Sequence, residues 1–377
     1  MATLNLDTTS GYRGYREPQR GESDEILVRT DKETPCGEYL RRYWQPIALT
    51  TEVEDVPKVI RVMGEELVLF CDKSGRYGLV HKQCPHRRAS MEFGVCETDG
   101  IRCCYHGWLF DVNGEILEIP GQPQKNVELV KKQTALGAYP VHEYRGLIFA
   151  YLGPIEEMPD FPVYDTLEIE GQTLVPYRAD YQCNWLQVLD AILDPIHTSF
   201  LHSRMSRAQF SEGMGEIGEL LFYERDMSFL GANIRRVDEH VWVRVNELVL
   251  PNYTQAGAAF SADGTKPIYY GRTAFARWVV PIDDEHSTAF AWAVFGDRAD
   301  PHEYNTPEGP ELIEQGELMD RPYEERQRFP GDAEAVEGQE RLIRERAGLL
   351  PRRGKREVLG LETAGDGVRG SGSRGGG

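Results

Sequence analysis

Two short cysteine–histidine pairs constrain this chain more strongly than any other feature of its sequence. One residue separates Cys84 from His86, two residues separate Cys103 from His106, and sixteen residues lie between the pairs. Each pair lies in a turn-rich segment, and four side chains of these types at this spacing predict a metal site. A chain that binds one metal group through both pairs must bring the two loops together.

The ligand types favour a [2Fe–2S] cluster. Two thiolates can hold one iron while two imidazoles hold the other, which raises the reduction potential above that of an all-cysteine cluster. A structural zinc with Cys₂His₂ ligands is the alternative, although zinc usually spaces its paired ligands by two to four residues. The two-residue gap before His106 selects Cys103 as the ligand, and we expect the adjacent Cys104 to be a packed thiol.

A second set of polar side chains interrupts an apolar helical pattern at residues 184–202. His197, His202 and Asp194 would be costly to bury there unless a partner such as a metal ion compensates them. Iron that activates O₂ outside haem is typically held by two histidines and one carboxylate. On an ideal helix the two imidazoles would point about 140° apart. We therefore expect a kink or a π-bulge here, and Pro195 provides a reason for the break.

The strand pattern divides the chain into two parts. Short β-type runs at 59–63, 67–71 and 77–81, separated by turn residues, indicate a small antiparallel β-domain that ends at a Pro-rich segment, 153–162. Later β-like runs accompany the histidine-bearing helix, which indicates an α+β fold. We predict an arm over 1–39, a β-domain over 40–155, a catalytic domain over 160–350, and a basic, Gly-rich and disordered tail over 351–377.

Composition limits the class of protein. The formal net charge of −19 over 377 residues would repel a polyanion, so nucleic acid is not expected as a partner. No apolar run approaches the length that crosses a membrane, and residues 1–22 lack the apolar core of a secretory signal. Seven cysteines, an odd number, favour reduced thiols or metal ligands over disulfides. We expect a cytoplasmic protein without a membrane segment.

The motifs together resemble a known family. Cys-Pro-His-Arg at 84–87, Cys-x-Tyr-His-Gly-Trp at 103–108 and Asp-x-x-His-x₄-His at 194–202 resemble the α-subunits of Rieske non-haem iron oxygenases. The segments 40–46 and 329–332 are most similar to the phthalate 4,5-dioxygenase-like branch. The similarity runs from about residue 25 to about residue 340. It implies a Rieske [2Fe–2S] domain of antiparallel strands and an α+β helix-grip (START-like) catalytic domain with an antiparallel sheet.

The resemblance also implies roles for individual residues. Cys84, His86, Cys103 and His106 would hold the cluster, and His197 and His202 would hold a mononuclear non-haem iron together with a distant carboxylate. Asp332 matches the family's third ligand, with Glu334 and then Asp320 as alternatives. Asp194 would cap a helix and link His197 to the cluster histidine His106 of a neighbouring subunit in a head-to-tail homotrimer.

The implied activity is that of a terminal oxygenase in aromatic catabolism. An NAD(P)H-dependent reductase, with or without a ferredoxin, would supply electrons, and O₂ would be inserted into an aromatic, carboxylated substrate. This chain has no Gly-rich dinucleotide fingerprint of its own. Arg204 and Arg207 could bind a substrate carboxylate by paired hydrogen bonds, and we also expect Asn184 near the substrate.

Three alternatives remain open at this stage. The first is monooxygenation, such as O-demethylation of a methoxy-aromatic compound, because it uses the same irons. The second is an electron carrier that uses only its Rieske domain. The third is an inactive, truncated relative, because family members usually continue with a helical tail where this chain becomes basic and Gly-rich after Pro351.

Overall fold

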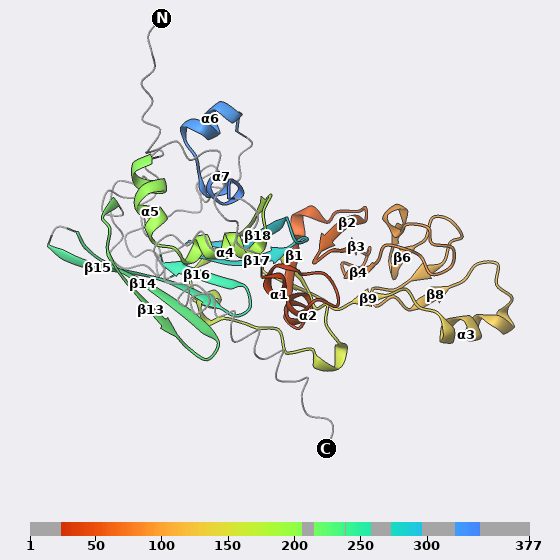
Figure 1. The fold of residues 1–377 in the computed structure, drawn as a ribbon. Coiled ribbons are helices and arrows are strands. Elements are labelled where there is room, and N and C mark those ends of the chain that lie inside the picture. The colour runs from red at the N-terminus through yellow and green to blue at the C-terminus, as the bar shows by residue number, and fades with distance from the viewer. Residues whose placement is uncertain (1–23, 206–214, 238, 258–272, 296–320, 340–377) are drawn as a thin grey trace, which may run out of the picture.

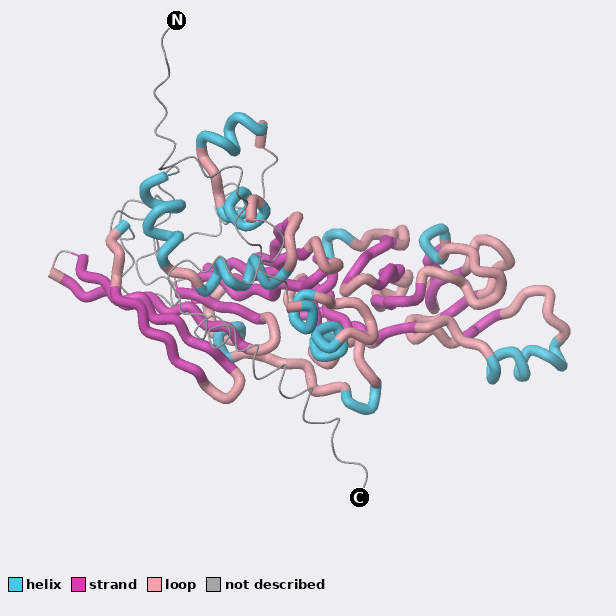
Figure 2. Tube along the Cα trace, in the orientation of Figure 1, coloured by secondary structure: helices cyan, strands magenta, loops and turns pink. Residues whose placement is uncertain are grey.

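The structure is a computed structural model of the chain, and it describes residues 24–205, 215–237, 239–257, 273–295 and 321–339. A large sheet with α4 and α5 lies at one end of the molecule, and smaller sheets lie at the other (Figure 1). Strands follow one another in groups along the trace, with the helices between the groups (Figure 2), and the strand pairs in the described ranges are antiparallel, which confirms the α+β class. No helix within these ranges has the length and apolar character needed to cross a membrane.

Three small sheets build the part that contains the two cysteine–histidine pairs. The strands predicted at 59–63, 67–71 and 77–81 are present, and two tight turns between them use Gly64 and Gly75 at positive φ. The sheets, in strand order, are β1 (Gln45–Leu49), β11 (Leu147–Ala150), β10 (Val141–Tyr144); β2 (Lys58–Val62), β3 (Glu65–Cys71), β4 (Tyr77–His81), β9 (Ala138–Tyr139); and β5 (Val95–Glu97), β6 (Gly100–Arg102), β7 (Leu109–Phe110), β8 (Ile116–Glu118).

A seven-stranded sheet forms the other part of the molecule. Side chains alternate between its faces: Trp242 and Leu248 are buried on the face that packs against helix α4, whereas Val241 and Val243 are exposed on the opposite face. This is the predicted helix-grip arrangement. The strand order is β12 (Thr173–Tyr181), β18 (Ser287–Phe295), β17 (Thr273–Pro281), β16 (Tyr253–Gly257), β15 (His240–Val249), β14 (Ser228–Val237), β13 (Glu219–Glu224).

The helices in the described ranges are short, and the longest of them is α3, a surface helix that the sequence did not predict. Near the end of the described residues, one helix begins at Tyr323 and another extends from Asp332 to Glu337. The α-helices are α1 (Glu25–Val28), α2 (Pro35–Arg41), α3 (Gln124–Gln133), α4 (Trp185–Leu193), α5 (Ile196–Phe200), α6 (Tyr323–Arg328) and α7 (Asp332–Glu337).

One apolar core connects two of the small sheets, β1–β11–β10 and β2–β3–β4–β9, to the large sheet, whereas the β5–β8 sheet packs in a second core. The rings of Phe149 on β11 and Trp278 on β17 lie 5.3 Å apart and meet edge to face. Beside them, the buried amides of Gln45 and Asn252 pair with each other, and the Asn252 Nδ2 donates to Gln45 Oε1 at 2.7 Å. The β1–β11–β10 sheet is thus fixed against the large one, while the predicted domain limits stay a prediction.

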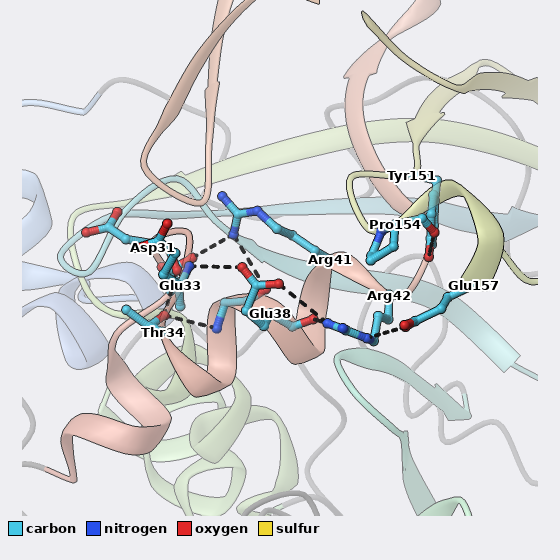
Figure 3. A network of polar contacts seen from close by, with 11 residues as sticks. Asp31, Glu33, Thr34, Glu38, Arg41, Arg42, Tyr151, Pro154 and Glu157 are labelled. Atoms are coloured by element: carbon cyan, nitrogen blue, oxygen red, sulfur yellow. Dashed lines mark hydrogen bonds and ion pairs between the residues drawn. The ribbon is translucent and has the colours of Figure 1, made fainter. Parts of the chain in front are cut away.

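A buried arginine on α2 connects the N-terminal helices to this core by hydrogen bonds to backbone carbonyls. Arg41 on α2 is only 2% exposed, and its guanidinium donates to the carbonyl oxygens of Thr30 at 3.0 Å and Met63 at 2.9 Å. Arg42, the next residue, is partly exposed and pairs with Glu157 at 2.6 Å (Figure 3). Arg41 therefore satisfies backbone acceptors that water does not reach, whereas Arg42 makes an ion pair at the surface.

We predict that these adjacent arginines differ in their contribution to stability. Arg41→Ala leaves buried carbonyl oxygens without donors and should lower the free energy of unfolding by about 3 kcal/mol. Arg42→Ala removes a surface ion pair and should lower it by less than about 1 kcal/mol. Urea unfolding followed by tryptophan fluorescence measures both. Equal losses would show that the hydrogen bonds of Arg41 to buried carbonyl oxygens stabilise the fold no more than the surface ion pair of Arg42 does.

Candidate metal centres

The two cysteine–histidine loops share one backbone design. In the first loop, the Cys84 carbonyl accepts from the N–H of Arg88 at 2.9 Å, and the Cys84 N–H donates to the Ala89 carbonyl at 2.8 Å. Cys103 makes the same two bonds to the residues four and five positions downstream, at 3.0 and 2.8 Å. The residue four positions after each cysteine has a positive φ, 62° in the first loop and 72° at Gly107 in the second. The repeated hydrogen bonds give the loops matching shapes.

The loops bring like ligands together. Cys84 and Cys103 are buried, and burial together with the neighbouring Cys103 thiol raises the pKa of Cys84 to about 11. His86 and His106 are exposed, with ring centroids 4.6 Å apart. Trp108 stacks on His86 with only 5° between the ring planes. A buried thiol pair beside an exposed imidazole pair fits the donor set of a Rieske-type cluster.

Cys104 differs from its expected environment. We predicted a packed thiol, but Cys104 is exposed, whereas Cys103 beside it is 2% exposed. Cys103 and Cys104 lie in a tight turn closed by the bond from the Gly107 N–H to the Cys103 carbonyl, and this turn buries the Cys103 thiol and exposes the Cys104 thiol. The two cysteines therefore differ in burial, and of the two it is the buried Cys103 that lies next to Cys84.

The second constellation is built on a broken helix. Helix α4 ends at Leu193, α5 resumes at Ile196, and a π-helical turn (Leu201–Met205) follows directly. His197 lies on α5 and His202 on the π-helical turn, so the expected kink and π-bulge are both confirmed. The extra residue in the turn rotates the second imidazole toward the first, and the two ring centroids lie 5.2 Å apart.

A carboxylate from far along the chain completes this group. Asp332 is the first residue of α7, and its Oδ1 lies 2.9 Å from His202 Nε2 and 3.6 Å from His197 Nε2. One ligand atom from each of the three side chains lies within 4.8 Å of the others. Two imidazoles and one carboxylate on the same side of the centre match the donor set that holds non-haem iron with open positions.

The alternatives to Asp332 lie elsewhere. Glu334 points away from the histidines: its carboxylate contacts Arg321 at 2.9 Å and Arg326 at 2.6 Å, and it accepts from the Gly331 N–H. These ion pairs join α6 to α7. Asp320 lies outside the described residues. Among the described residues, Asp332 is therefore the only one of the carboxylates predicted for this role that lies beside the histidine pair.

Helix α7 is held against α4 and the start of the histidine segment. Val336 is 2% exposed in the apolar core, and its carbonyl accepts from Gln187 Nε2 on α4 at 3.3 Å. Glu337 accepts from the backbone N–H of Gln182 at 2.9 Å. Because the two histidines and Asp332 are more than a hundred residues apart in sequence, these contacts fix their distance.

Asp194 lies at the break between α4 and α5. Its Oδ1 accepts from the Ile196 N–H at 2.8 Å, as expected for a helix cap, and its Oδ2 lies 3.8 Å from His197 Nδ1. Burial raises the pKa of Asp194, but His197 and the backbone N–H of Ile196 outweigh this effect and lower it. The carboxylate is therefore ionised at neutral pH and faces the ring nitrogen of His197 that points away from Asp332.

Comparisons with known proteins agree with these two centres. Residues 43–140 match the model of the Rieske [2Fe-2S] domain. The chain is 42% identical over 349 residues to the tert-butanol monooxygenase / tert-amyl alcohol desaturase oxygenase subunit of Aquincola tertiaricarbonis. The matched region covers 88% of this chain and 73% of that protein. The chain belongs to the Rieske non-haem iron oxygenases.

Two further comparisons support this membership. The α-subunit of phenoxybenzoate dioxygenase from Ectopseudomonas oleovorans is 37% identical over 346 residues, which is 85% of this chain and 79% of that protein. A crystal structure of dicamba monooxygenase bound to 3,6-dichlorosalicylic acid has the same fold, with a TM-score of 0.64 at 17% identity, over 86% of this chain and 98% of that one. This Rieske oxygenase is therefore the oxygenase component of a multicomponent system, and it uses a [2Fe–2S] cluster and a mononuclear non-haem iron.

A cavity opens beside the three candidate iron ligands of the oxygenase. Arg244 on β15 and Arg277 on β17 line it, together with Asn246 on β15. The remaining lining residues are mostly apolar: Tyr181, Val188, Ala191, Ile192, Thr198, Phe275 and Val336. Neither arginine was predicted from the sequence to lie at the site. A signal was present, because Arg244 occupies an inward position of a strand whose other inward residues include Trp242 and Leu248.

Two of the three residues predicted to contact substrate, Arg204 and Asn184, do not line this cavity. Arg204 is exposed and donates to the Gly215 carbonyl at 2.7 Å. Asn184 caps α4, and its side chain also donates to the carbonyls of Val28 at 3.1 Å and Asp284 at 2.8 Å. Its polar atoms therefore bond backbone groups of the protein itself. The substrate role expected for these two residues does not fit their positions, and Arg207 lies outside the described residues.

The environments of the two adjacent cysteines generate a prediction. Cys103→Ser removes a buried thiol beside Cys84, and acid-labile sulfide should fall from about two per chain to nearly none. Cys104→Ser changes an exposed thiol and should leave the sulfide content and the visible spectrum of the cluster unchanged. Loss of the cluster in the Cys104 variant but not in the Cys103 variant would reverse the assignment.

Proposed function

We propose that this oxygenase hydroxylates a carboxylated aromatic molecule bound in the cavity beside its iron site. The observation that supports this substrate class most directly is the position of Arg244 and Arg277 in the wall that also contains His197, His202 and Asp332. The relative from Ectopseudomonas, named a phenoxybenzoate dioxygenase subunit, acts on a molecule of this class according to its name.

The charges in the cavity favour an anion. Burial lowers the pKa of Arg244 to about 10, the nearby guanidinium groups of Arg235 and Arg277 lower it as well, and Asp332 acts in the opposite direction. Arg244 is still protonated at neutral pH, so three like charges lie near one another. A carboxylate relieves this repulsion and can accept two parallel hydrogen bonds from a guanidinium group.

The ligand assignments follow from the two constellations. We propose that Cys84, His86, Cys103 and His106 hold the [2Fe–2S] cluster and that His197, His202 and Asp332 hold the mononuclear iron. Bound there, the iron supplies O₂ activation, which no protein side chain provides. Asp194 orients His197 from behind by facing Nδ1, which leaves Nε2 toward the metal position.

We also propose a head-to-tail homotrimer. The cluster loops next to β6 and the iron ligands on α5 lie at opposite ends of the molecule (Figure 1), while His106 and Asp194 are both exposed. Contact between the cluster end of one copy and the α5 end of the next would place His106 against Asp194. A separate NAD(P)H-dependent reductase, with or without a ferredoxin, would supply electrons, and the free cysteines support a cytoplasmic location.

Monooxygenation is the second candidate function. The relative from Aquincola is named a monooxygenase and desaturase of small tertiary alcohols, and a third relative is named a 5,5'-dehydrodivanillate O-demethylase oxygenase subunit. Turnover with labelled O₂ separates the outcomes. A cis-dihydrodiol with two labelled atoms shows dioxygenation, whereas one labelled atom in the product shows monooxygenation.

The arginine assignment can be tested by substitution. Arg244→Gln removes the charge and the paired donors, and it should weaken the binding of aromatic carboxylates at least about tenfold, the range of a lost hydrogen bond to a charged group. Arg204→Gln, at an exposed position away from the cavity, should leave the affinity unchanged. Titration calorimetry with benzoate measures both. If only the Arg204 variant binds more weakly, carboxylate recognition lies outside the cavity.

A further inference from the structure

We propose that Asn246 makes this oxygenase selective for substrates that carry a hydroxyl group as a hydrogen-bond donor. The substrate class would be hydroxylated aromatic carboxylates, with the carboxylate at the arginines and the hydroxyl at Asn246 Oδ1. This inference rests on the proposed function, because it adds a second polar contact to the same cavity.

The orientation of the Asn246 amide follows from its neighbour. Asn246 Nδ2 donates to the backbone carbonyl of Ile192 at 2.9 Å. A carbonyl oxygen can only accept, so the amide nitrogen must face Ile192 and the amide oxygen must face the other way. The bond ties strand β15 to the end of α4, one turn before His197, and it fixes the direction of Oδ1.

The amide oxygen has no hydrogen-bond partner in the described part of the chain. Asn246 is 6% exposed, and its Oδ1 is a buried acceptor without a donor. The residue also lines the cavity that contains the iron ligands. Buried acceptors are nearly always satisfied in folded proteins, and an unsatisfied one costs free energy. A donor on a molecule in the cavity would remove this cost.

The two kinds of polar group in the cavity require complementary groups on the ligand. Arg244 and Arg277 only donate, so they need an acceptor such as a carboxylate, whereas Asn246 Oδ1 only accepts. An unsubstituted aromatic carboxylate would satisfy the arginines but cover the Asn246 oxygen with apolar atoms. Sites built to bond a hydroxyl discriminate strongly against analogues that lack it, because the buried polar group is then left unpaired.

The test compares benzoate with the three monohydroxybenzoates by titration calorimetry on the full, iron-loaded chain under anaerobic conditions. At least one hydroxy isomer should bind about tenfold or more tightly than benzoate, the range expected for satisfying a buried acceptor. In Asn246→Leu this ratio should fall to about one. Loss of the Ile192 bond affects both ligands alike, so the ratio isolates the contact of Oδ1 with the ligand hydroxyl.

Two variants serve as controls. Ile192→Ala alters the apolar wall of the same cavity but keeps the Ile192 carbonyl, so it should weaken both ligands and preserve the ratio. Asn246→Asp keeps an oxygen acceptor and loses the donor to Ile192, so it should also preserve the preference for the hydroxy isomer. This second variant tests the inference even if Asn246→Leu fails to fold.

The outcomes separate this inference from the proposed function. Three results would overturn the inference: equal binding of benzoate and the hydroxybenzoates to the wild-type chain, a preference that survives Asn246→Leu, or a preference that Asn246→Asp abolishes. In each case the role of Asn246 is only to bond the Ile192 carbonyl. If none of the four acids binds the wild-type chain, the carboxylate proposal fails, and the inference fails with it.

Discussion

The distorted helix that carries both histidines is the physical constraint on which the site depends. A regular helix would direct His197 and His202 about 140° apart, too far for both to bind one ion. The π-helical turn that follows α5 changes this angle, and the ring centroids lie 5.2 Å apart. The helix is also interrupted before His197, at Asp194 and Pro195. The carboxylate that caps the new helix also faces His197 Nδ1. The π-helical turn therefore sets the spacing of the two imidazoles, and the break at Asp194 sets the orientation of His197.

The remainder of the catalytic part positions other groups against this break. Helix α7 brings Asp332 to the histidines because Val336 packs in the core and its carbonyl accepts from Gln187 on α4. On the opposite wall, Asn246 ties strand β15 to the end of α4, which places Arg244 on the same strand beside the iron ligands. The cavity is thus enclosed by elements that also support the ligands.

Much of this arrangement could be predicted because it depends on local pattern. The spacing of Cys84, His86, Cys103 and His106 indicated a cluster, and the distance between His197 and His202 required a helix distortion that the structure contains. Asp332 was selected by family resemblance and not by local chemistry, since many acids lie in that region of the chain. Its contact with His202 depends on the packing of α7, which no local pattern encodes.

The errors have physical reasons as well. Arg204 and Asn184 are close to the histidines in sequence, but a helix directs neighbouring side chains to different faces, and both residues bond to backbone groups instead. Arg244 was missed because it lies on a strand that approaches the histidines only in the folded sheet. Cys104 was predicted to be buried because the sequence did not show which side of its loop faces the core.

Iron analysis of two carboxylate variants tests whether α7 places Asp332 beside the histidine pair as the third iron ligand. Asp332→Ala should lower the iron content by about one atom per chain, while the acid-labile sulfide of the cluster stays constant as an internal reference. Glu334→Gln, which keeps an acceptor for the Gly331 N–H, should retain that iron. Full iron content in the Asp332 variant, with loss in the Glu334 variant, would contradict the account.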